Sequence, residues 1–299
     1  MRSLLAVPAF LAALALAPLV GAQPVNADCT ALDAELRQAF ERQEIARFDE
    51  LHARLLSDVT CDGAYRDRVG RLMARMLYAA NPGHDRAALE KALGFGRPWQ
   101  VTAALADLEY DARHWPEAVK LYEEAIDDIR DEAATPKAPP REVEERIVKR
   151  ALQARALAPS YVQTRQFRGR KSGLSSPHFR NFSAVAVPVP VQFEYDSSDL
   201  TEDGVRAVED IYAYLQENPH RGLTIVGHTD PRGSDTYNRR LSTDRARTVA
   251  NYIAELGYPF EIRVVGRGES QPFEPDDAGK YTTDELYAFD RRVEYMIDE

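Results

Sequence analysis

The stretch "GHTDPRGSDTYNRRLSTDRARTVANYI", residues 227 to 253, decides how the C-terminal part of this chain folds. The apolar run Leu223 to Val226 comes directly before it and is typical of a buried β-strand. A polar loop with glycine and proline follows, and the arginine-rich segment after the loop has the pattern of a helix from Leu241 to Leu256. The sequence therefore predicts a strand, a loop and a helix in succession, the unit from which α/β domains are built.

Two opposite charges lie on the two sides of this loop. Asp230 follows the strand, and Arg245 lies in the first turn or so of the predicted helix, for which Ser242 is a plausible N-cap. The carboxyl ends of strands commonly hold the ligand sites of α/β proteins. A zwitterion fits such a site, because Asp230 can bind an ammonium group and Arg245 can bind a carboxylate with its planar guanidinium. A structural ion pair across the loop is the alternative.

The flanking segments predict an alternating α/β domain. The run "AVAVPVPVQFEY", residues 184 to 195, has the pattern of an extended strand, with prolines suited to its start or to a sheet edge. The other expected elements are a helix capped by Asp199 or Thr201 and stopped by Asn218-Pro219, and the later strands Ile262–Val265 and Val293–Ile297.

One long run carries a family resemblance. "VGHTDPRGSDTYNRRLSTDRARTVANYIAELG", with "VQFEYDSSDL" before it and "GRGESQP" and "DRRVEYMI" after it, resembles the OmpA-like peptidoglycan-binding domain. The resemblance covers residues 188 to 299 and implies a βαβαβ-type sandwich with a mixed sheet. It also implies the ligand, the free end of meso-diaminopimelate in the peptidoglycan stem peptide. Such a ligand is bound without covalent chemistry, and the protein is thereby tethered to the cell wall.

The resemblance also implies the site residues. Asp230 and Arg245 match the principal ligand pair of the family. The other matching positions are Thr229, Asn238 and Leu241 in the pocket-lining loop and helix start, Asp196 after the first strand, and Arg291 in the closing motif. Asp290 stands where the family has asparagine, and this extra carboxylate either strengthens capture of the ammonium group or pairs with Arg291.

The N-terminal half has a helical pattern from Ala31 to about Pro159, with breaks at residues 61–63, 81–83 and 94–98. Residues 105 to 126 resemble a tetratricopeptide repeat, although Glu109 and Arg113 depart from its usual tyrosine and glycine. The matching packing residues are Leu105, Ala106, Trp115, Ala118, Tyr122 and Ala125. We therefore expect residues 23 to 160 to form helical hairpins that engage a protein partner, and a helical bundle without a ligand groove is the alternative.

Residues 161 to 187 are predicted to link the two domains. The segment 164–183 has five basic residues and no acidic one, with scattered glycine, serine and proline. Its interleaved phenylalanines leave contact with an anionic polymer as the alternative. The predicted fold class is thus α + α/β, a helical-hairpin domain followed by the OmpA-like domain at residues 188 to 299.

The first 22 residues predict export. A basic start, a short apolar run broken by prolines and a small-residue site at Ala22 are typical of a secretory signal peptide, and a membrane anchor is the alternative. No later stretch is apolar enough to span a membrane. We expect the mature chain in the periplasm, either free or associated with the outer membrane. In that compartment Cys29 and Cys61 predict a disulfide, worth about 3 kcal/mol on the chain-entropy estimate, with two unpaired thiols as the alternative.

Other chemistries find weak support. The net charge of −10 excludes long-range attraction to nucleic acid, so we expect no nucleic-acid partner. His228, Asp230 and Ser234 have the residue types of a hydrolase, but the G-x-S-x-G motif is absent. His228 and Asp230 alone make a weak metal site. We therefore expect a binding protein without catalytic activity, cofactor or metal, and a pure protein-interaction scaffold is the second alternative.

Overall fold

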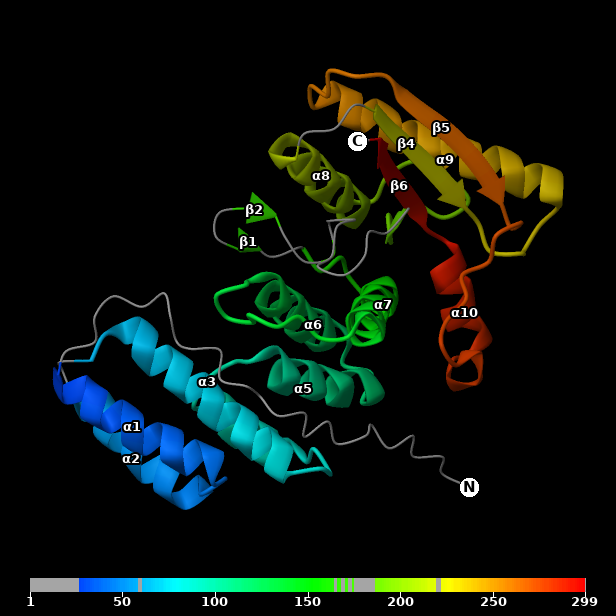
Figure 1. Cartoon of the computed structure of the whole chain (residues 1–299). Coiled ribbons are helices and arrows are strands. Elements are labelled where there is room, and N and C mark those ends of the chain that lie inside the picture. Colours follow the sequence, from blue (N-terminus) through cyan, green and yellow to red (C-terminus); the bar gives the residue numbers. More distant parts are fainter. Residues whose placement is uncertain are drawn as a thin grey trace. The chain divides into compact units, whose positions relative to one another are not determined.

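The computed structural model describes residues 27–58, 61–163, 166–167, 170–171, 174, 186–218 and 222–298 (Figure 1). The chain divides into two compact units, residues 1–70 and 71–299, each of which is described by itself. The predicted signal peptide and most of the predicted linker lie outside the described residues. The predicted domain boundaries at residues 22, 160 and 187 stay predictions.

The first unit is helical. It contains α1 (Ala27–Glu41), α2 (Ile45–Ser57) and the start of α3 (Gly63–Ala80), which continues into the second unit. Leu36, Leu51 and Leu55 recur at helical spacing and are buried, as their pattern predicts. Cys61 is also buried, but the side chain of Cys29 lies outside the described residues. The disulfide between them therefore stays a prediction.

The second unit begins with helices and ends with a sheet. Its helices before the sheet are α4 (Arg86–Leu93), α5 (Trp99–Asp111), α6 (Trp115–Arg130) and α7 (Arg141–Leu157). Ala106 of α5 and Ala118 of α6 are fully buried, and Tyr122 fills the space between the helices. Small and aromatic residues thus pack α5 against α6 as the repeat-like pattern predicts. The assignment as a tetratricopeptide repeat itself remains a prediction.

The C-terminal part contains a mixed four-stranded sheet in the order β3-β6-β4-β5. Its strands are β3 (Val187–Val189), β4 (Gly222–His228), β5 (Ile262–Gly268) and β6 (Val293–Asp298). Strand β4 pairs with β5 in parallel, whereas β6 runs antiparallel to both β3 and β4. Helices α8 (Glu202–Glu217) and α9 (Asp235–Glu255) share one apolar core with the sheet (Figure 1). The predicted fold class, helical hairpins followed by an α/β part with a mixed sheet, is confirmed.

Three elements differ from the predictions. Helix α9 starts at Asp235, six residues before the predicted start, and its N-cap is Ser234. The predicted N-cap, Ser242, is instead buried inside the helix, where its Oγ accepts a hydrogen bond from the backbone N–H of Gly268. A short helix that the sequence did not predict, α10 (Thr283–Asp290), precedes β6. Two small elements, the hairpin β1 (Gln166–Phe167) with β2 (Arg170–Lys171) and the 3₁₀ turn Ala278–Lys280, complete the described structure.

A buried ion pair joins α7 to the sheet part. Arg155 of α7 lies 3.5 Å from Asp210 of α8, and their side chains are 1% and 2% exposed. Tyr161 donates a hydrogen bond of 2.9 Å to the same carboxylate and packs in the core of the sheet. Residues 188 to 299 therefore share their core with the segment before them, so binding experiments are best made with the whole exported chain.

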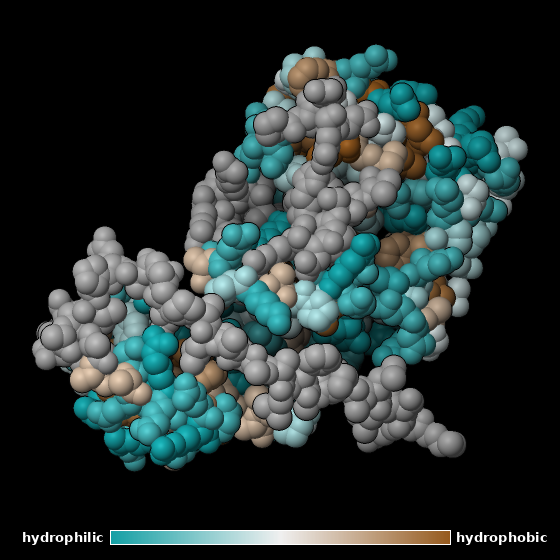
Figure 2. All heavy atoms as spheres, viewed as in Figure 1, coloured by the Kyte–Doolittle hydropathy of each residue, from teal (hydrophilic) through white to brown (hydrophobic). Residues whose placement is uncertain are grey.

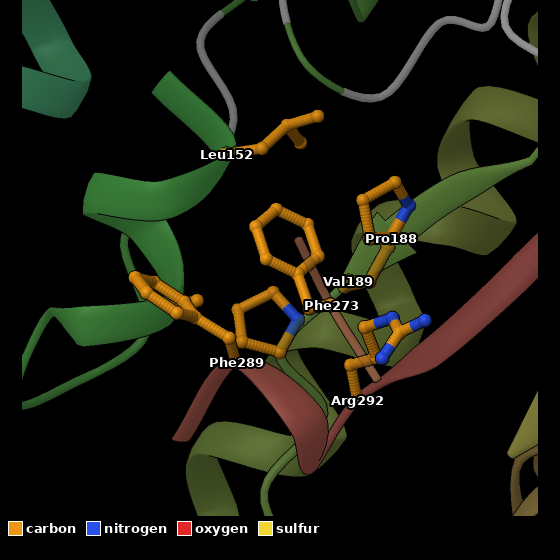
Figure 3. A pocket seen from close by; sticks show the side chains of 8 residues that line it. Leu152, Pro188, Val189, Phe273, Phe289 and Arg292 are labelled. Carbon is orange, nitrogen blue, oxygen red and sulfur yellow. The ribbon is translucent and has the colours of Figure 1, made fainter. Parts of the chain in front are cut away.

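A pocket lies where α7, β3 and α10 meet (Figure 3). Its lining is apolar apart from Arg292 and consists of Leu152, Ala156, Pro188, Val189, Pro190, Phe273 and Phe289. Neither Asp230 nor Arg245 contributes to it. The pocket marks the packing of α7 against the sheet part, and the described surface visible in Figure 2 is mostly hydrophilic.

Candidate functional site

The loop after β4 is fixed by both neighbouring strands. The backbone N–H of His228 donates to the carbonyl of Arg292, and that of Thr229 donates to the carbonyl of Gly268. Helix α9 crosses β4 so closely that a Cβ atom at Gly227 would lie 2.1 Å from the carbonyl oxygen of Ser242. Only glycine fits there, and this close packing brings the helix beside the loop. The sequence thus places strand end and helix together as predicted.

Asp230 lies at the centre of the site, and two arginines hold it. Arg232 contacts both carboxylate oxygens, with Nη2 2.6 Å from Oδ2 and Nε 3.2 Å from Oδ1. Arg291 adds a third contact, with Nη1 2.8 Å from Oδ2. Burial raises the pKa of Asp230, but the hydrogen bonds from Arg232 and Arg291 outweigh burial and lower the pKa to about 2. Asp230 is therefore an ionised carboxylate at neutral pH.

Arg245 lies in the third turn of α9, because the helix starts earlier than predicted. Its placement in the first turn was wrong. Its Nε donates a 3.0 Å hydrogen bond to the carbonyl of Ser197, and its guanidinium lies 4.9 Å from the centroid of the Phe193 ring. Burial lowers the pKa of Arg245, and the charge of Asp230 acts in the opposite direction. Among the described residues none accepts a hydrogen bond from Nη1 or Nη2 of Arg245, and it forms no ion pair with Asp230.

Asp196 stands beside Arg245 on the loop that precedes α8. Its φ of 54° lies in the left-handed region, which aspartate tolerates better than most residues. The hydroxyl of Tyr237, in the first turn of α9, donates a hydrogen bond to Oδ1 of Asp196. The backbone carbonyl that Arg245 binds belongs to the next residue, Ser197. The structure thus brings Asp196 and Arg245 together through α9 and this loop.

The other predicted residues have different environments. Asn238 is buried, and its amide donates to the backbone carbonyl of Asp230 and to the carboxylate of Glu269, so it braces the loop from beneath. Thr229 is also buried, and no described group bonds to its hydroxyl. Leu241 lies half-buried in the second turn of α9.

Arg291 and Asp290 come from the end of α10. Arg291 is the C-cap of this helix and extends to Asp230, which places it in the site as predicted. Asp290 accepts a 2.8 Å hydrogen bond from the backbone N–H of Phe273, and in the part of the chain described here it forms no ion pair with Arg291. The suggested pairing of Asp290 with Arg291 was therefore wrong. Burial raises the pKa of Asp290.

A second charged layer lies below the loop. Nε2 of His228 is 3.4 Å from a carboxylate oxygen of Glu294, and Nε of Arg292 donates to the other oxygen at 2.8 Å. Burial raises the pKa of Glu294, but His228 and Arg292 outweigh it and lower the pKa to about 2. Within the described ranges no three His, Cys, Asp or Glu side chains are grouped as metal ligands. Ser234, the third hydrolase candidate, is the N-cap of α9 and bonds to the backbone of Tyr237.

Three residues of the site were missed at the sequence level. They are Arg232 and Tyr237, which contact Asp230 and Asp196, and Tyr287, whose ring lies 5.2 Å from the guanidinium of Arg232. The motif around Asp230 includes the first two residues, but nothing in the sequence says which arginine of the loop turns back. Tyr287 belongs to the unpredicted helix α10, whose capping box of Thr282 and Glu285 was the available signal.

Comparison with known proteins agrees with this geometry. The model of the OmpA family matches residues 192–282. A peptidoglycan-associated lipoprotein of Pseudomonas putida is 31% identical over 127 residues, which are 42% of this chain and 73% of the relative. Outer membrane porin F of Pseudomonas aeruginosa is 34% identical over 116 residues, 38% of this chain and 32% of the porin. The chain thus spans about a third of the length of the first curated relatives that it matches.

A solved structure is similar as well. The crystal structure of the peptidoglycan-associated lipoprotein from Burkholderia pseudomallei is 26% identical, with a TM-score of 0.30 over 37% of this chain and 94% of that chain. The matched region holds β4, α9 and the loop with Asp230. By the identity and coverage of these relatives, this chain belongs to the OmpA family.

Proposed function

We propose that the site at Asp230 binds peptidoglycan without covalent chemistry, through the diaminopimelate of the stem peptide. The ammonium group of this residue goes to Asp230, and its carboxylate goes to Arg245. The observation that carries the proposal is the unequal state of the two charges. Asp230 is an ionised carboxylate, while the Nη1 and Nη2 groups of Arg245 have no acceptor among the described residues.

The environment of Arg245 favours a bound carboxylate over a structural ion pair. The side chain is half-buried on an aromatic ring and holds one backbone carbonyl through Nε, which leaves the two outer nitrogens of the fork. A guanidinium binds a carboxylate best through two parallel hydrogen bonds. A ligand that brings its own carboxylate therefore completes the site.

The surrounding residues support the same ligand in supplementary roles. Asp196 lies next to Arg245 and can bind a second donor of the ligand, and Arg291 keeps Asp230 ionised. Asn238 and Thr229 fix the loop from below and at the strand end. Leu241 supplies apolar contact from the second turn of α9. These roles extend the family resemblance to the contacts of this chain.

For the whole protein we infer an exported scaffold tethered to the cell wall. The names of the relatives, a peptidoglycan-associated lipoprotein and an outer membrane porin, support a location in the periplasm or at the outer membrane. None of the helices in the described ranges is long and apolar enough to cross a bilayer. The helices before the sheet then engage a protein partner, and the predicted signal peptide and the Cys29–Cys61 disulfide belong to the same scheme. A mass difference between alkylated samples with and without reduction tests the disulfide.

The proposal is tested by sedimentation of the exported chain with insoluble peptidoglycan. Wild type is expected in the pellet, and Asp230→Ala and Arg245→Ala are expected in the supernatant. Arg247→Ala is the matched control, because Arg247 is exposed two residues further along α9 and pairs with Asp244. Equal pelleting of all four proteins would exclude the site and favour a pure protein-interaction scaffold. Release of soluble wall fragments by wild type, lost in His228→Ala, would favour a hydrolase instead.

A further inference from the structure

Arg232 occupies the position where the proposed ligand must bind. Its guanidinium contacts both oxygens of Asp230, and its backbone N–H donates to Oδ1 at 3.1 Å. An ammonium group that approaches Asp230 therefore meets a cation already in place. Binding must exchange one ion pair for another, and only the difference between the two contributes to affinity.

The two arginines on Asp230 differ in how they are held. Arg291 is the C-cap of α10, and its position is fixed where that helix leads into β6. Arg232 lies in the loop itself, between Pro231 and Gly233, and its side chain is 62% exposed. Gly233 has a φ of 114°, which lets the chain turn back directly after Arg232. Arg232 can therefore leave Asp230 for solvent without moving a helix or a strand.

A second contact retains Arg232 near the site. Its guanidinium lies 5.2 Å from the centroid of the Tyr287 ring on α10. A cation over an aromatic face is attracted by the ring, weakly at an exposed position. The carboxylate on one side and the ring on the other define a resting position for this side chain.

We propose that Arg232 is an internal competitor that sets the affinity of the site. In the free protein it neutralises Asp230, and a ligand binds only when it displaces the guanidinium. A ligand with an ammonium group alone gains one ion pair and loses another. A ligand that also brings a carboxylate to Arg245 gains a second interaction and binds. Unwanted binding of simple amines is thereby suppressed, which is a form of specificity by competition. This inference rests on the proposed function.

The competition makes a distinctive thermodynamic prediction. The interaction of Arg232 with Asp230 belongs to the free protein, so its removal strengthens the binding of every ligand that uses Asp230 by the same factor. The factor is up to about fivefold, the usual value of an exposed ion pair. Removal of an arginine that contacted the ligand would instead weaken binding of the ligand.

The test is calorimetric titration of the exported chain with two tripeptides, L-Ala-D-Glu-meso-diaminopimelate and the same peptide with L-lysine, which is followed by competition where binding is weak. Arg232→Gln is expected to tighten the binding of both peptides by a similar factor. Tyr287→Ala, which removes the ring and leaves the charge, is expected to give a smaller gain.

Arg240→Gln is the matched control, because it makes the same change of net charge at an 81% exposed position on α9, 3.8 Å from Asp244. Weaker binding of the diaminopimelate peptide by Arg232→Gln, or a gain no larger than that of Arg240→Gln, would overturn the competitor role. Absence of binding by wild type would instead count against the proposed function.

Discussion

Two carboxylates of this protein are held by arginine, and they differ in what surrounds them. Asp210 binds Arg155 in the core between α7 and α8, where the two side chains are 2% and 1% exposed. Asp230 binds Arg232 and Arg291, whose side chains are 62% and 40% exposed, at the loop after β4. The chemistry of the contacts is the same. Burial therefore decides which pair is a fixed part of the core and which one a ligand can enter.

The energetic consequences of breaking each pair differ accordingly. Loss of one partner in the core leaves a charge without water or a counterion, which is strongly destabilising. At the loop, water replaces a lost partner at little cost to the fold, because exposed ion pairs contribute little. Mutation should therefore affect stability at Asp210 and binding at Asp230.

The largest effect is expected from Arg155→Ala. This change leaves Asp210 charged and buried, and we expect the free energy of unfolding to fall by about 3 to 5 kcal/mol. Urea denaturation followed by circular dichroism measures the change. The control is Arg206→Ala, which breaks a pair with Asp203 at a 56% exposed arginine and should change stability by at most about 0.5 kcal/mol. Equal effects of the two variants would remove the distinction between closed and open pairs.

Asp230→Ala should have the opposite profile. We expect the binding of peptidoglycan to weaken by about 2 to 5 kcal/mol, because the ammonium group of the ligand loses its counterion. The free energy of unfolding should change by about 1 kcal/mol or less, since Arg232 and Arg291 become hydrated. Wall sedimentation and urea denaturation of the same preparation measure both quantities. A loss of stability as large as that of Arg155→Ala would show that Asp230 is also structural.

The sequence predicts this open site better than the closed one. Thr201 as an N-cap, the strand that leads to His228 and the positions of Asp230 and Arg291 all follow from local patterns. The pair of Arg155 with Asp210 does not, because 55 residues separate the partners and only the packing of α7 on α8 unites them.

The errors at the site also have a physical cause. Ser242 has the residue type of an N-cap, but the close approach of α9 to Gly227 buries it within the helix. Arg245 consequently lies two turns further along α9 than expected. The choice of Arg232 as the partner of Asp230 depends on the loop conformation around Gly233, which no periodic pattern encodes.

Arg245→Gln sharpens the assignment of the two ends of the ligand. We expect the binding of the diaminopimelate tripeptide to weaken about tenfold, the value of one charge-assisted hydrogen bond. Binding of the lysine tripeptide, which lacks the second carboxylate, should not change. Competition calorimetry measures both. Equal weakening for the two peptides would mean that Arg245 supports the loop and does not contact this carboxylate.

The smallest effect concerns pH and Glu294. The pKa of Glu294 in the folded protein is about 2, below the ordinary 4.5, so its ionisation stabilises the fold above pH 4.5 and this stabilisation is lost as the pH falls toward 2. The Glu294→Gln variant should therefore lose less stability than wild type between pH 5 and pH 3. Urea midpoints across this range measure the difference. Identical slopes would show that the contacts of Glu294 with His228 and Arg292 do not lower its pKa.

The most direct test of the account is titration of the exported wild-type chain with the diaminopimelate tripeptide and with its lysine counterpart under the same conditions. If Asp230 and Arg245 together bind a zwitterion, the diaminopimelate peptide binds at least about tenfold more tightly, as one added charge-assisted contact requires. Equal affinity for the two peptides, or no heat with either, would contradict the two-charge site.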